Sequence, residues 1–305
     1  MLIKEYSIVI PTHNRREKLK NLIESIYSID SIPAEIIVVD DASTDGSKEY
    51  ISKRFPDIKY YEMEREKWPG FTISYGIAKA HNNLVYIIDD DNVIDERSVK
   101  ALLSVFATDI SGEYGVVGPV TCYFKERNKI MYAGARYNKI TSTPNFNFAG
   151  SDYSVLETGQ NKNKLIEVDG IPNAFMVRRD FAILSGLIPQ YIPAQGEDGF
   201  LIYSIKRKLK KKIVVSTNAV IFHDYEETGR YNNVRLYYTM RTKIHFIRMS
   251  FSFPRNIINL SFTPLVLFYW ALKAAKSDRA DWGTWILVRG YMDGIFGIKE
   301  RKFIQ

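Results

Sequence analysis

The sequence predicts an α/β fold, with a mostly parallel sheet flanked by helices and a helical region at the C-terminal end. Residues 1–120 alternate strand-like and helix-like segments, which is the pattern of a parallel sheet covered by helices. Within them, Val85–Ile88 is an uninterrupted apolar and aromatic run, typical of a strand buried on both faces. After Gly229 the chain changes to aromatic and basic segments with helical spacing.

Composition sets the broad class of the protein. The 305 residues are 46% hydrophobic and 25% charged, as in an ordinary globular protein with one large or two small domains. A single cysteine, Cys122, excludes a disulfide framework and fits a reducing compartment. We expect no signal peptide, because Met1–Glu5 lead straight into a strand, and we therefore expect a cytoplasmic protein. The net charge of +7 suggests an anionic partner, namely nucleotide, phospholipid or nucleic acid.

The first 120 residues contain four strand–helix pairs. Apolar runs predict the strands, and apolar residues at helical spacing predict the helices that follow them. Pro11 stops the first strand, and Ser43, Thr44 and Asp45 are candidate N-caps for the second helix. The predicted strands are 6–10, 36–39, 58–62 and 85–88, and the predicted helices are 19–27, 43–54, 73–80 and 99–106.

Polar clusters follow three of these strands, at Pro11–Arg15, at Asp40–Asp41 and at Asp89–Asp91. In an open α/β sheet ligands bind outside the carboxyl ends of the strands, so we expect the clusters to meet at one edge. Three adjacent aspartates repel one another, and a hard divalent cation shared with a substrate phosphate is the usual compensation. A solvated acidic turn before the next helix is the alternative interpretation. Dinucleotide-binding and P-loop glycine motifs are absent from the sequence.

The second part of the chain is less regular. Residues 121–164 predict loops and short strands, either a substrate-facing insertion or a plain β-excursion. Glu197 and Asp198 open a predicted helix, where acids also suit the helix dipole without any further role. His223 follows a predicted strand. The remaining predicted strands are 166–169, 174–177, 213–215 and 219–222, with helices at 180–186 and from 196 into the basic run 206–212.

The C-terminal region predicts three helices, over 231–249, 257–272 and 282–296. The apolar segment 257–272 is broken by Asn259, Ser261, Thr263 and Pro264, and its sixteen residues are fewer than the roughly twenty that cross a bilayer. Mixed aromatic and basic residues favour docking on anionic lipid. A helical subdomain that covers a hydrophobic surface of the protein is the alternative.

Taken together, these motifs resemble glycosyltransferase family 2, whose catalytic domain has the Rossmann-like GT-A fold. The resemblance covers about residues 5–225 and is closest to rhamnosyl- and galactofuranosyl-transferase-like members. One departure is Ile73–Gly76, where the family often has Arg-Asn-x-Gly; the glycine is present and the polar pair is not. Any sugar or phosphate contact made by that pair in relatives is therefore not expected in this chain.

The resemblance implies roles for individual residues. Glu197 and Asp198 match the catalytic Glu-Asp pair, with Asp198 as the base. Metal ligation is implied for Asp89, Asp91 and His223. Nucleotide-sugar binding is implied for Pro11, Thr12, His13, Arg15, Asp41, Asp89 and Asp90.

The expected function follows from these roles. It is an inverting, metal-dependent transfer, with Mn²⁺ or Mg²⁺, from a nucleoside-diphosphate sugar to a hydroxyl of a lipid-linked or polysaccharide acceptor. The expected domains are 1–228, with a nucleotide half to about 120, and 229–305, docking on the cytosolic membrane face. A sugar-nucleotide pyrophosphorylase is an alternative, although Pro11–Arg15 lacks its usual glycines. A basic membrane- or nucleic-acid-binding module is another, although the aspartates would repel phosphate unless they held metal.

Overall fold

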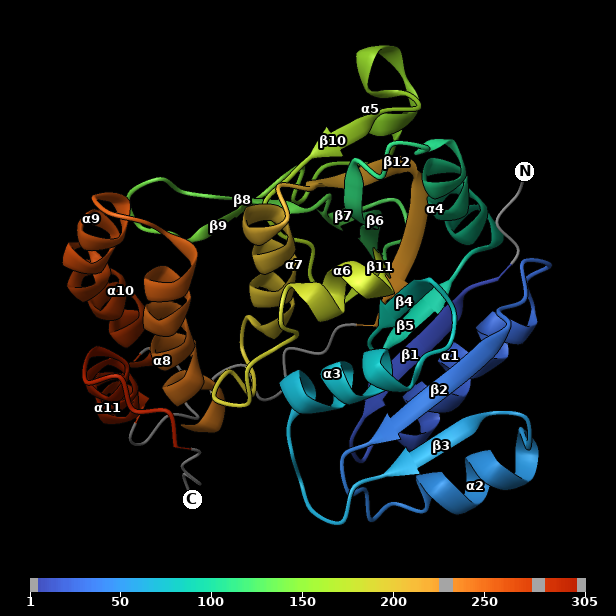
Figure 1. The fold of residues 1–305 in the computed structure, drawn as a ribbon, viewed down its shortest axis with the longest axis horizontal. Helices are drawn as coiled ribbons and strands as arrows, with labels where there is room; N and C mark the ends of the chain where they lie inside the picture. The colour runs from blue at the N-terminus through green and yellow to red at the C-terminus, as the bar shows by residue number, and fades with distance from the viewer. Residues whose placement is uncertain (1–4, 225–232, 276–282, 301–305) are drawn as a thin grey trace.

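A computed structural model describes residues 5–224, 233–275 and 283–300. Within these residues a ten-stranded sheet forms the centre of the molecule (Figure 1), with main strand order β10-β12-β6-β11-β4-β1-β2-β3. The strands from β4 to β3 are parallel, as predicted, and β6 and β12 are also parallel, whereas β11 runs antiparallel between β4 and β6. The strand bounds are β1 Ser7–Thr12, β2 Glu35–Asp40, β3 Lys59–Glu62, β4 Leu84–Ile88, β5 Asn92–Ile94, β6 Tyr114–Tyr123, β7 Ile130–Tyr132, β10 Leu165–Glu167, β11 Ala174–Arg178 and β12 Lys212–His223.

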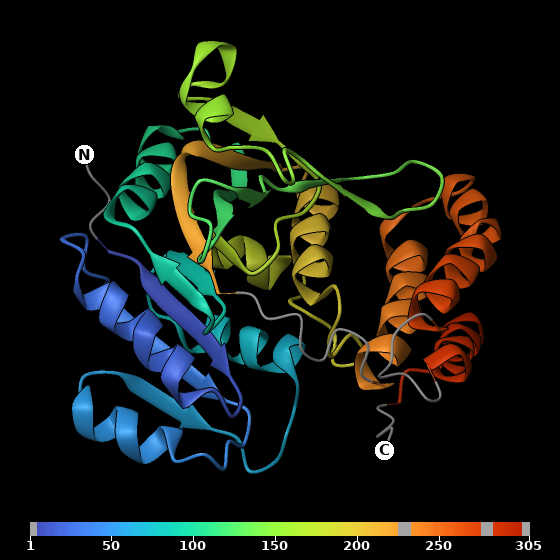
Figure 2. The same ribbon diagram turned by 180° about the vertical axis from the view of Figure 1, so that it is seen from behind.

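Helices cover both faces of this sheet (Figures 1 and 2) because successive strand residues point to opposite sides. Ile8 and Ile10 pack with α1 Arg16–Tyr27, α2 Ser47–Arg54 and α4 Glu96–Thr108. Val9 packs on the other side, with α3 Pro69–Lys79, α6 Arg179–Leu184 and α7 Glu197–Lys208. Gly76 lets α3 lie directly on β1, since a Cβ at this position would be 2.3 Å from the Val9 side chain.

The strands of the second half differ from the prediction. β6 is a buried central strand that the sequence analysis did not identify. The predicted strands 213–215 and 219–222 form one strand, β12, which contains a register shift between Val215 and Val220. The shift keeps the polar residues between them in the strand, where the Thr217 hydroxyl donates to Asn161 O at 2.9 Å. Residues 121–164 contain β7, the hairpin β8 Ala135–Tyr137 and β9 Pro144–Phe146, helix α5 Ser154–Glu157 and a 3-10 turn Gly159–Asn161.

The C-terminal helices pack on one another and lie beside the sheet domain (Figure 1). The predicted helix 257–272 is two helices, because α9 ends at Ser261 and α10 starts at Thr263, immediately before Pro264; the helix breaks at positions that the sequence marks. Close contact between α8 and α11 depends on Gly290, where a Cβ would be 2.2 Å from Tyr237 O. The bounds are α8 Asn233–Ser250, α9 Arg255–Ser261, α10 Thr263–Ala275 and α11 Gly283–Ile295.

The C-terminal helices contact the sheet domain through the end of α8 and through α9. Phe246, Ile247 and Phe251, at the end of α8, belong to the same buried cluster as residues of α7 and β12. Asn259 donates its side-chain amide to Lys139 O, at 2.7 Å, in the β8–β9 hairpin. The end of α8 therefore completes the main core, and the predicted domain boundary near residue 229 lies outside the described residues. None of the helices that the structure describes combines the length and the apolar character needed to cross a bilayer.

Candidate active site

The acidic loop Asp89–Asp91 follows β4 and is held by Thr12, the last residue of β1, and by Arg15, which follows β1. Thr12 Oγ1 donates to Asp90 Oδ2 at 2.7 Å, and Arg15 Nη1 donates to Asp90 Oδ1 and Asp91 Oδ2, each at 3.0 Å. β1 and β4 are parallel neighbours, so their carboxyl ends lie at one edge of the sheet. The predicted convergence of the first and third polar clusters is therefore confirmed.

The second polar cluster, Asp40–Asp41, reaches the same edge of the sheet, because the residues that follow it bind Asn14. The backbone N–H of Asn14 donates to Ser43 Oγ at 2.8 Å, and the Asn14 side-chain oxygen accepts from Thr44 N at 2.7 Å. His13 lies beside this contact, with its Nδ1 2.8 Å from Asp41 O. All three polar clusters thus meet outside the carboxyl ends of the parallel strands, where open α/β sheets bind ligands.

His223, the last residue of β12, contacts the acidic loop. Its Nε2 lies 3.1 Å from Asp91 Oδ1, and the backbone N–H of Asp224 donates to Asp91 O at 2.8 Å. Burial alone would raise the pKa of Asp91, but His223, together with the positive charges of Arg15 and Lys18, lowers it. Asp91 is therefore ionised and paired with an imidazole.

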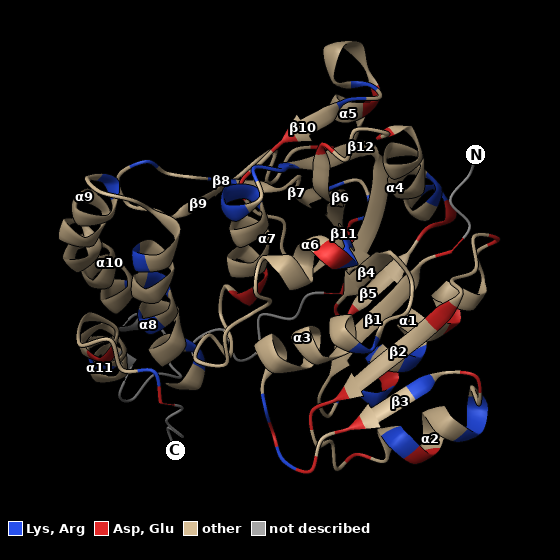
Figure 3. Ribbon diagram, in the orientation of Figure 1, with Lys and Arg blue, Asp and Glu red and all other residues tan. Residues whose placement is uncertain are grey.

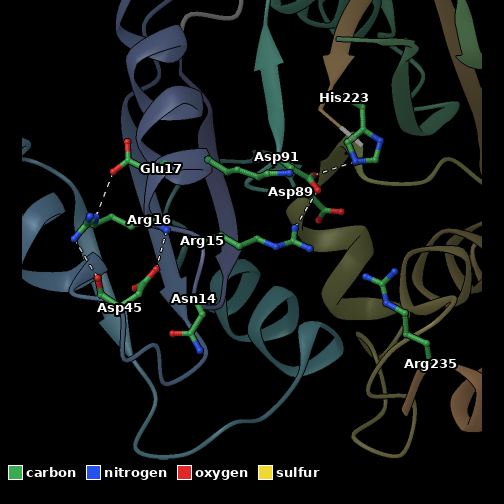
Figure 4. A pocket seen from close by; sticks show the side chains of 10 residues that line it. Asn14, Arg15, Arg16, Glu17, Asp45, Asp89, Asp91, His223 and Arg235 are labelled. Atoms are coloured by element: carbon green, nitrogen blue, oxygen red, sulfur yellow. Dashed lines mark hydrogen bonds and ion pairs between the residues drawn. The ribbon is translucent and has the colours of Figure 1, made fainter. Parts of the chain in front are cut away.

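Asp89 is different, because its carboxylate makes no hydrogen bond or ion pair with the residues that the structure describes. Burial raises the pKa of Asp89 well above the usual value, and the charges of Asp198, Asp91, Asp90 and Glu197 add to this effect. Figure 4 shows Asp89, Asp91 and His223 close together at one end of a cavity, with Arg15 beside them.

These donors fit a hard divalent cation by their chemistry. Two carboxylates and an imidazole are ligands that Mn²⁺ accepts, and the unbonded Asp89 carboxylate lacks a positive partner. The described residues nevertheless include no group of three His, Cys, Asp or Glu side chains already set as a metal site. Only the Asp91–His223 pair of the predicted ligand set is in direct contact.

The cavity beside this loop, which we call the donor cavity, has a volume of about 620 Å³. Arg15, Lys18 and Arg235 line it together with the carboxylates, so positive charge lies beside the acidic loop. Lys18 and Arg235 were not predicted: Lys18 looked like any solvated helix residue, and Arg235 belongs to the basic helix interpreted as membrane-facing. The remaining lining residues are Asn14, Arg16, Glu17, Asp45, Asp89, Asp91 and His223.

Several predicted nucleotide-binding residues support this cavity without lining it. Pro11 and Thr12 are buried in β1, and Asp90 is buried beneath Arg15. Asp41 is also buried, and its two carboxylate oxygens accept from Lys67 N at 2.5 Å and Trp68 N at 2.7 Å. Asp41 thus holds the loop before α3, and its contact with a nucleotide sugar stays a prediction.

Glu197 and Asp198 lie at the start of α7 and line a second cavity of about 940 Å³. The N-cap of this helix is Gly196, and Asp198 Oδ2 instead accepts from the backbone N–H of Asn173 at 3.1 Å. The carbonyl of Asn173 accepts from Asp89 N at 2.9 Å. Asn173 therefore places Asp198 next to the acidic loop, a role for which the sequence carries no signal.

The two acids of this pair differ in their protonation. Burial raises the pKa of Asp198 to about 6, partly offset by the Asn173 N–H. Burial and the charge of Asp198 raise the pKa of Glu197 to about 8, and its Oε2 is buried without a hydrogen-bond partner. At neutral pH, Asp198 is therefore mainly a carboxylate and Glu197 mainly a neutral acid. A buried carboxylate with a pKa near neutrality is suited to accept a proton.

This parallel sheet, with acids and bases converging at the carboxyl ends of its strands, defines an α/β protein of the GT-A type. Residues 7–182 match the family model of Glycosyl transferase family 2, which is more than half of the chain. The chain therefore belongs to glycosyltransferase family 2, a family of inverting hexosyltransferases.

Similar proteins agree with this assignment. The chain is 25% identical over 134 residues to a poly-beta-1,6-N-acetyl-D-glucosamine synthase of Staphylococcus epidermidis, covering 43% of this chain and 31% of the relative. It is 32% identical over 101 residues to a GalNAc(5)-diNAcBac-PP-undecaprenol beta-1,3-glucosyltransferase of Campylobacter jejuni, covering 32% and 33%. Each match spans about a third of the relative's length.

A solved structure shares the fold. GalNAc-T7 with UDP, GalNAc and Mn²⁺ aligns with a TM-score of 0.64 at 15% identity, over 96% of this chain and 56% of that one.

Proposed function

We propose that this chain transfers a sugar, with inversion, from a nucleoside-diphosphate sugar to a hydroxyl of a lipid-linked or polysaccharide acceptor. The observation that carries this proposal is the link through Asn173. Its carbonyl binds Asp89 of the donor cavity and its N–H binds Asp198 of the second cavity. A charge-binding site and a base are thereby held side by side.

The diphosphate of the donor binds in the donor cavity. Arg15, Lys18 and Arg235 offer positive charge to the phosphates, and Asp89, Asp91 and His223 would hold Mn²⁺ or Mg²⁺. A divalent ion in this place neutralises the charge that develops on the leaving nucleoside diphosphate. The GalNAc-T7 structure, which contains UDP and Mn²⁺, supports the same choice of donor and metal.

The acceptor binds in the second cavity, which we call the acceptor cavity. Inversion needs the acceptor hydroxyl to attack the anomeric carbon from the face opposite the leaving group. As the new C–O bond forms and the bond to the diphosphate breaks, Asp198 takes the hydroxyl proton. At neutral pH Glu197 is mainly uncharged, so it adds no second negative charge beside Asp198.

The alternative functions lose support. A pyrophosphorylase normally has a glycine-rich loop after the first strand, and membership of family 2 favours sugar transfer. A nucleic-acid-binding module would bring phosphates against the acidic loop Asp89–Asp91. The two relatives named above differ in acceptor, one making a polysaccharide and one acting on an undecaprenol-linked saccharide, so both acceptor classes belong to the proposal.

We also propose peripheral association with an anionic membrane surface on its cytosolic face. Residues 233–275 contain six basic and no acidic residues (Figure 3), and α10 exposes Leu265 and Phe268 at 63% each. Positive charge next to exposed apolar side chains suits the interface of a bilayer with anionic lipid.

A donor panel tests the proposed function. The protein is incubated with UDP-GlcNAc, GDP-mannose, UDP-galactofuranose or dTDP-rhamnose, the last two because of the sequence resemblance, together with Mn²⁺ or Mg²⁺ and membrane-lipid or polysaccharide extracts. We expect release of nucleoside diphosphate from one donor and its loss with EDTA or in Asp91→Asn. Asp95→Asn is the matched control, because Asp95 caps α4 outside the donor cavity. Formation of pyrophosphate from a sugar phosphate and a nucleoside triphosphate would instead show a pyrophosphorylase.

A further inference from the structure

The acceptor cavity has a composition that restricts its ligand. The β8–β9 hairpin, the start of α7, one side of α8 and one side of α10 enclose it. Its aromatic lining residues are Tyr137, Phe146, Phe246, Tyr269 and Trp270. Its charged lining residues are two acids, Glu197 and Asp198, and two bases, Lys243 and Lys273.

Lys243 is the feature that the proposed reaction does not use. It lies on the face of α8 that also presents Thr239, Thr242 and Phe246 to the cavity, at helical spacing. Its side chain is half-buried and makes no hydrogen bond or ion pair with the described residues. Burial lowers the pKa of Lys243 to about 8, so at neutral pH the side chain is mainly an ammonium, and within the described ranges it has no ion-pair partner. An anion in the cavity would supply that partner.

The mouth of the cavity is apolar. Leu265 and Tyr269 line the cavity and are also 63% and 52% exposed, so they belong both to the cavity and to the outer surface. On α10 they share one helix face with Phe268 and Leu272. We call this surface the α9–α10 apolar face; its exposed residues are Ile257, Ile258, Phe262, Leu265, Phe268, Tyr269 and Leu272. At its edge the Lys273 ammonium lies 4.9 Å from the centre of the Tyr269 ring.

A soluble polysaccharide would leave both features unused. Its hydroxyl groups would face the apolar mouth, a polysaccharide without phosphate offers no anion to Lys243, and a phosphate-containing polymer would still leave the apolar mouth uncovered. A hydrocarbon chain would bury exposed apolar surface, at about 25 cal/mol for each Å² removed from water. The basic residues and the absence of acids over 233–275 add attraction for an anion next to that chain.

Building on the proposed function, we propose that the acceptor is a lipid-linked saccharide with phosphate between its sugar and its hydrocarbon chain. The sugar hydroxyl faces Asp198, the phosphate binds Lys243, and the hydrocarbon lies on the α9–α10 apolar face. Asp198, Lys243 and Leu265 all line this cavity, and of the three only Leu265 is also exposed at the outer surface, which is where the hydrocarbon end of such a molecule would lie. Lys243 is thus a residue that determines acceptor specificity.

Binding of farnesyl diphosphate tests this assignment without any turnover. Titration calorimetry in EDTA compares farnesyl diphosphate with farnesol, which lacks phosphate, and with inorganic pyrophosphate, which lacks the hydrocarbon. We expect farnesyl diphosphate to bind at least about tenfold more tightly than either, and Lys243→Gln to weaken it at least about tenfold. Leu265→Asp, on the exposed part of the face, should weaken it as well and provides a second variant that does not disturb the core.

Lys18→Gln is the matched control, because Lys18 lines the donor cavity. Farnesyl diphosphate should bind Lys18→Gln as it binds the unmodified protein. The assignment is overturned if Lys243→Gln binds like the unmodified protein, if Lys18→Gln is the variant that loses binding, or if pyrophosphate binds as tightly as farnesyl diphosphate. Absence of binding also overturns it.

The proposed function has a separate readout. If it holds, Lys243→Gln still binds nucleoside diphosphate with Mn²⁺, and the unmodified protein still releases nucleoside diphosphate from its donor. Failure of these two results concerns the donor cavity, whereas failure of farnesyl diphosphate binding concerns only the acceptor.

Discussion

Replacing Asp198 by asparagine separates its role as a base from its role in the fold. Asparagine keeps the shape of the side chain and a carbonyl oxygen that can still accept from Asn173 N, the 3.1 Å hydrogen bond that holds Asp198 in place. It removes the basicity. A general base contributes about 10²- to 10⁴-fold in rate, so we expect sugar transfer by Asp198→Asn to fall at least about a hundredfold.

The same substitution should not weaken nucleotide binding in the donor cavity, in contrast to its effect on sugar transfer. The charge of Asp198 is one cause of the raised pKa of Asp89, after burial. Removing that charge lowers the pKa of Asp89 and leaves more of it ionised at neutral pH. Binding of nucleoside diphosphate with Mn²⁺ should therefore be unchanged or tighter, while transfer is lost.

The pH dependence of the unmodified enzyme gives an independent check. With the pKa of Asp198 at about 6, about nine tenths of the base is ionised at pH 7 and about one tenth at pH 5. Transfer should therefore rise about tenfold from pH 5 to pH 7. Initial rates are measured with the donor and acceptor found by the panel, and nucleotide binding by titration calorimetry. A near-normal rate for Asp198→Asn would refute the assignment, and if Glu197→Gln were then inactive, Glu197 would be the base.

Three further substitutions test other parts of the structure. His223→Gln should lower Mn²⁺ affinity at least about tenfold, measured by electron paramagnetic resonance with nucleoside diphosphate present, and leave the circular dichroism spectrum unchanged; equal affinity would make His223 a packing residue. Burial raises the pKa of Glu197 to about 8, so the stability that the protonated side chain contributes is complete below the ordinary pKa of a glutamate and is lost as pH rises through 8. At pH 9 the Glu197→Gln protein should therefore have a higher melting temperature than the unmodified protein, and at pH 5 the two melting temperatures should differ less. Gly290→Ala should reduce the free energy of unfolding by about 1–3 kcal/mol, because the new Cβ meets the backbone oxygen of Tyr237 at 2.2 Å. Gly294→Ala should cost less, because its Cβ meets the Ile244 side chain at 3.0 Å and the backbone oxygen of Arg241 at 3.3 Å; equal melting temperatures for the two variants would contradict this.

Truncation of the C-terminal helices would not test membrane docking alone. Phe246 and Ile247 of α8, and Phe251 just after it, are part of the main core, and Arg235 lines the donor cavity. Substitutions on the α9–α10 apolar face, such as Leu265→Asp, test the surface without opening the core.

The sequence by itself determined the parallel half of the sheet and the edge at which the acids meet. Alternating apolar runs identify β1, β2 and β4, and parallel strands place their carboxyl ends at one edge. Residues that directly follow such strands, including Arg15, Asp89 and Asp91, are therefore brought together whatever lies between them in the chain. Their chemistry can be predicted because their position depends on the strand alone.

The tertiary structure alone decided which residues complete the two cavities. Asn173, Lys18, Arg235 and Lys243 belong to a loop or to helices, and their residue types and spacing are those of ordinary solvated positions. They reach the cavities because elements distant in sequence pack against one another, and no local periodicity encodes that packing. Asp41 is the opposite case. It follows β2 as predicted, but its carboxylate accepts hydrogen bonds from the backbone of Lys67 and Trp68 in the loop before α3, and only the tertiary structure shows that contact.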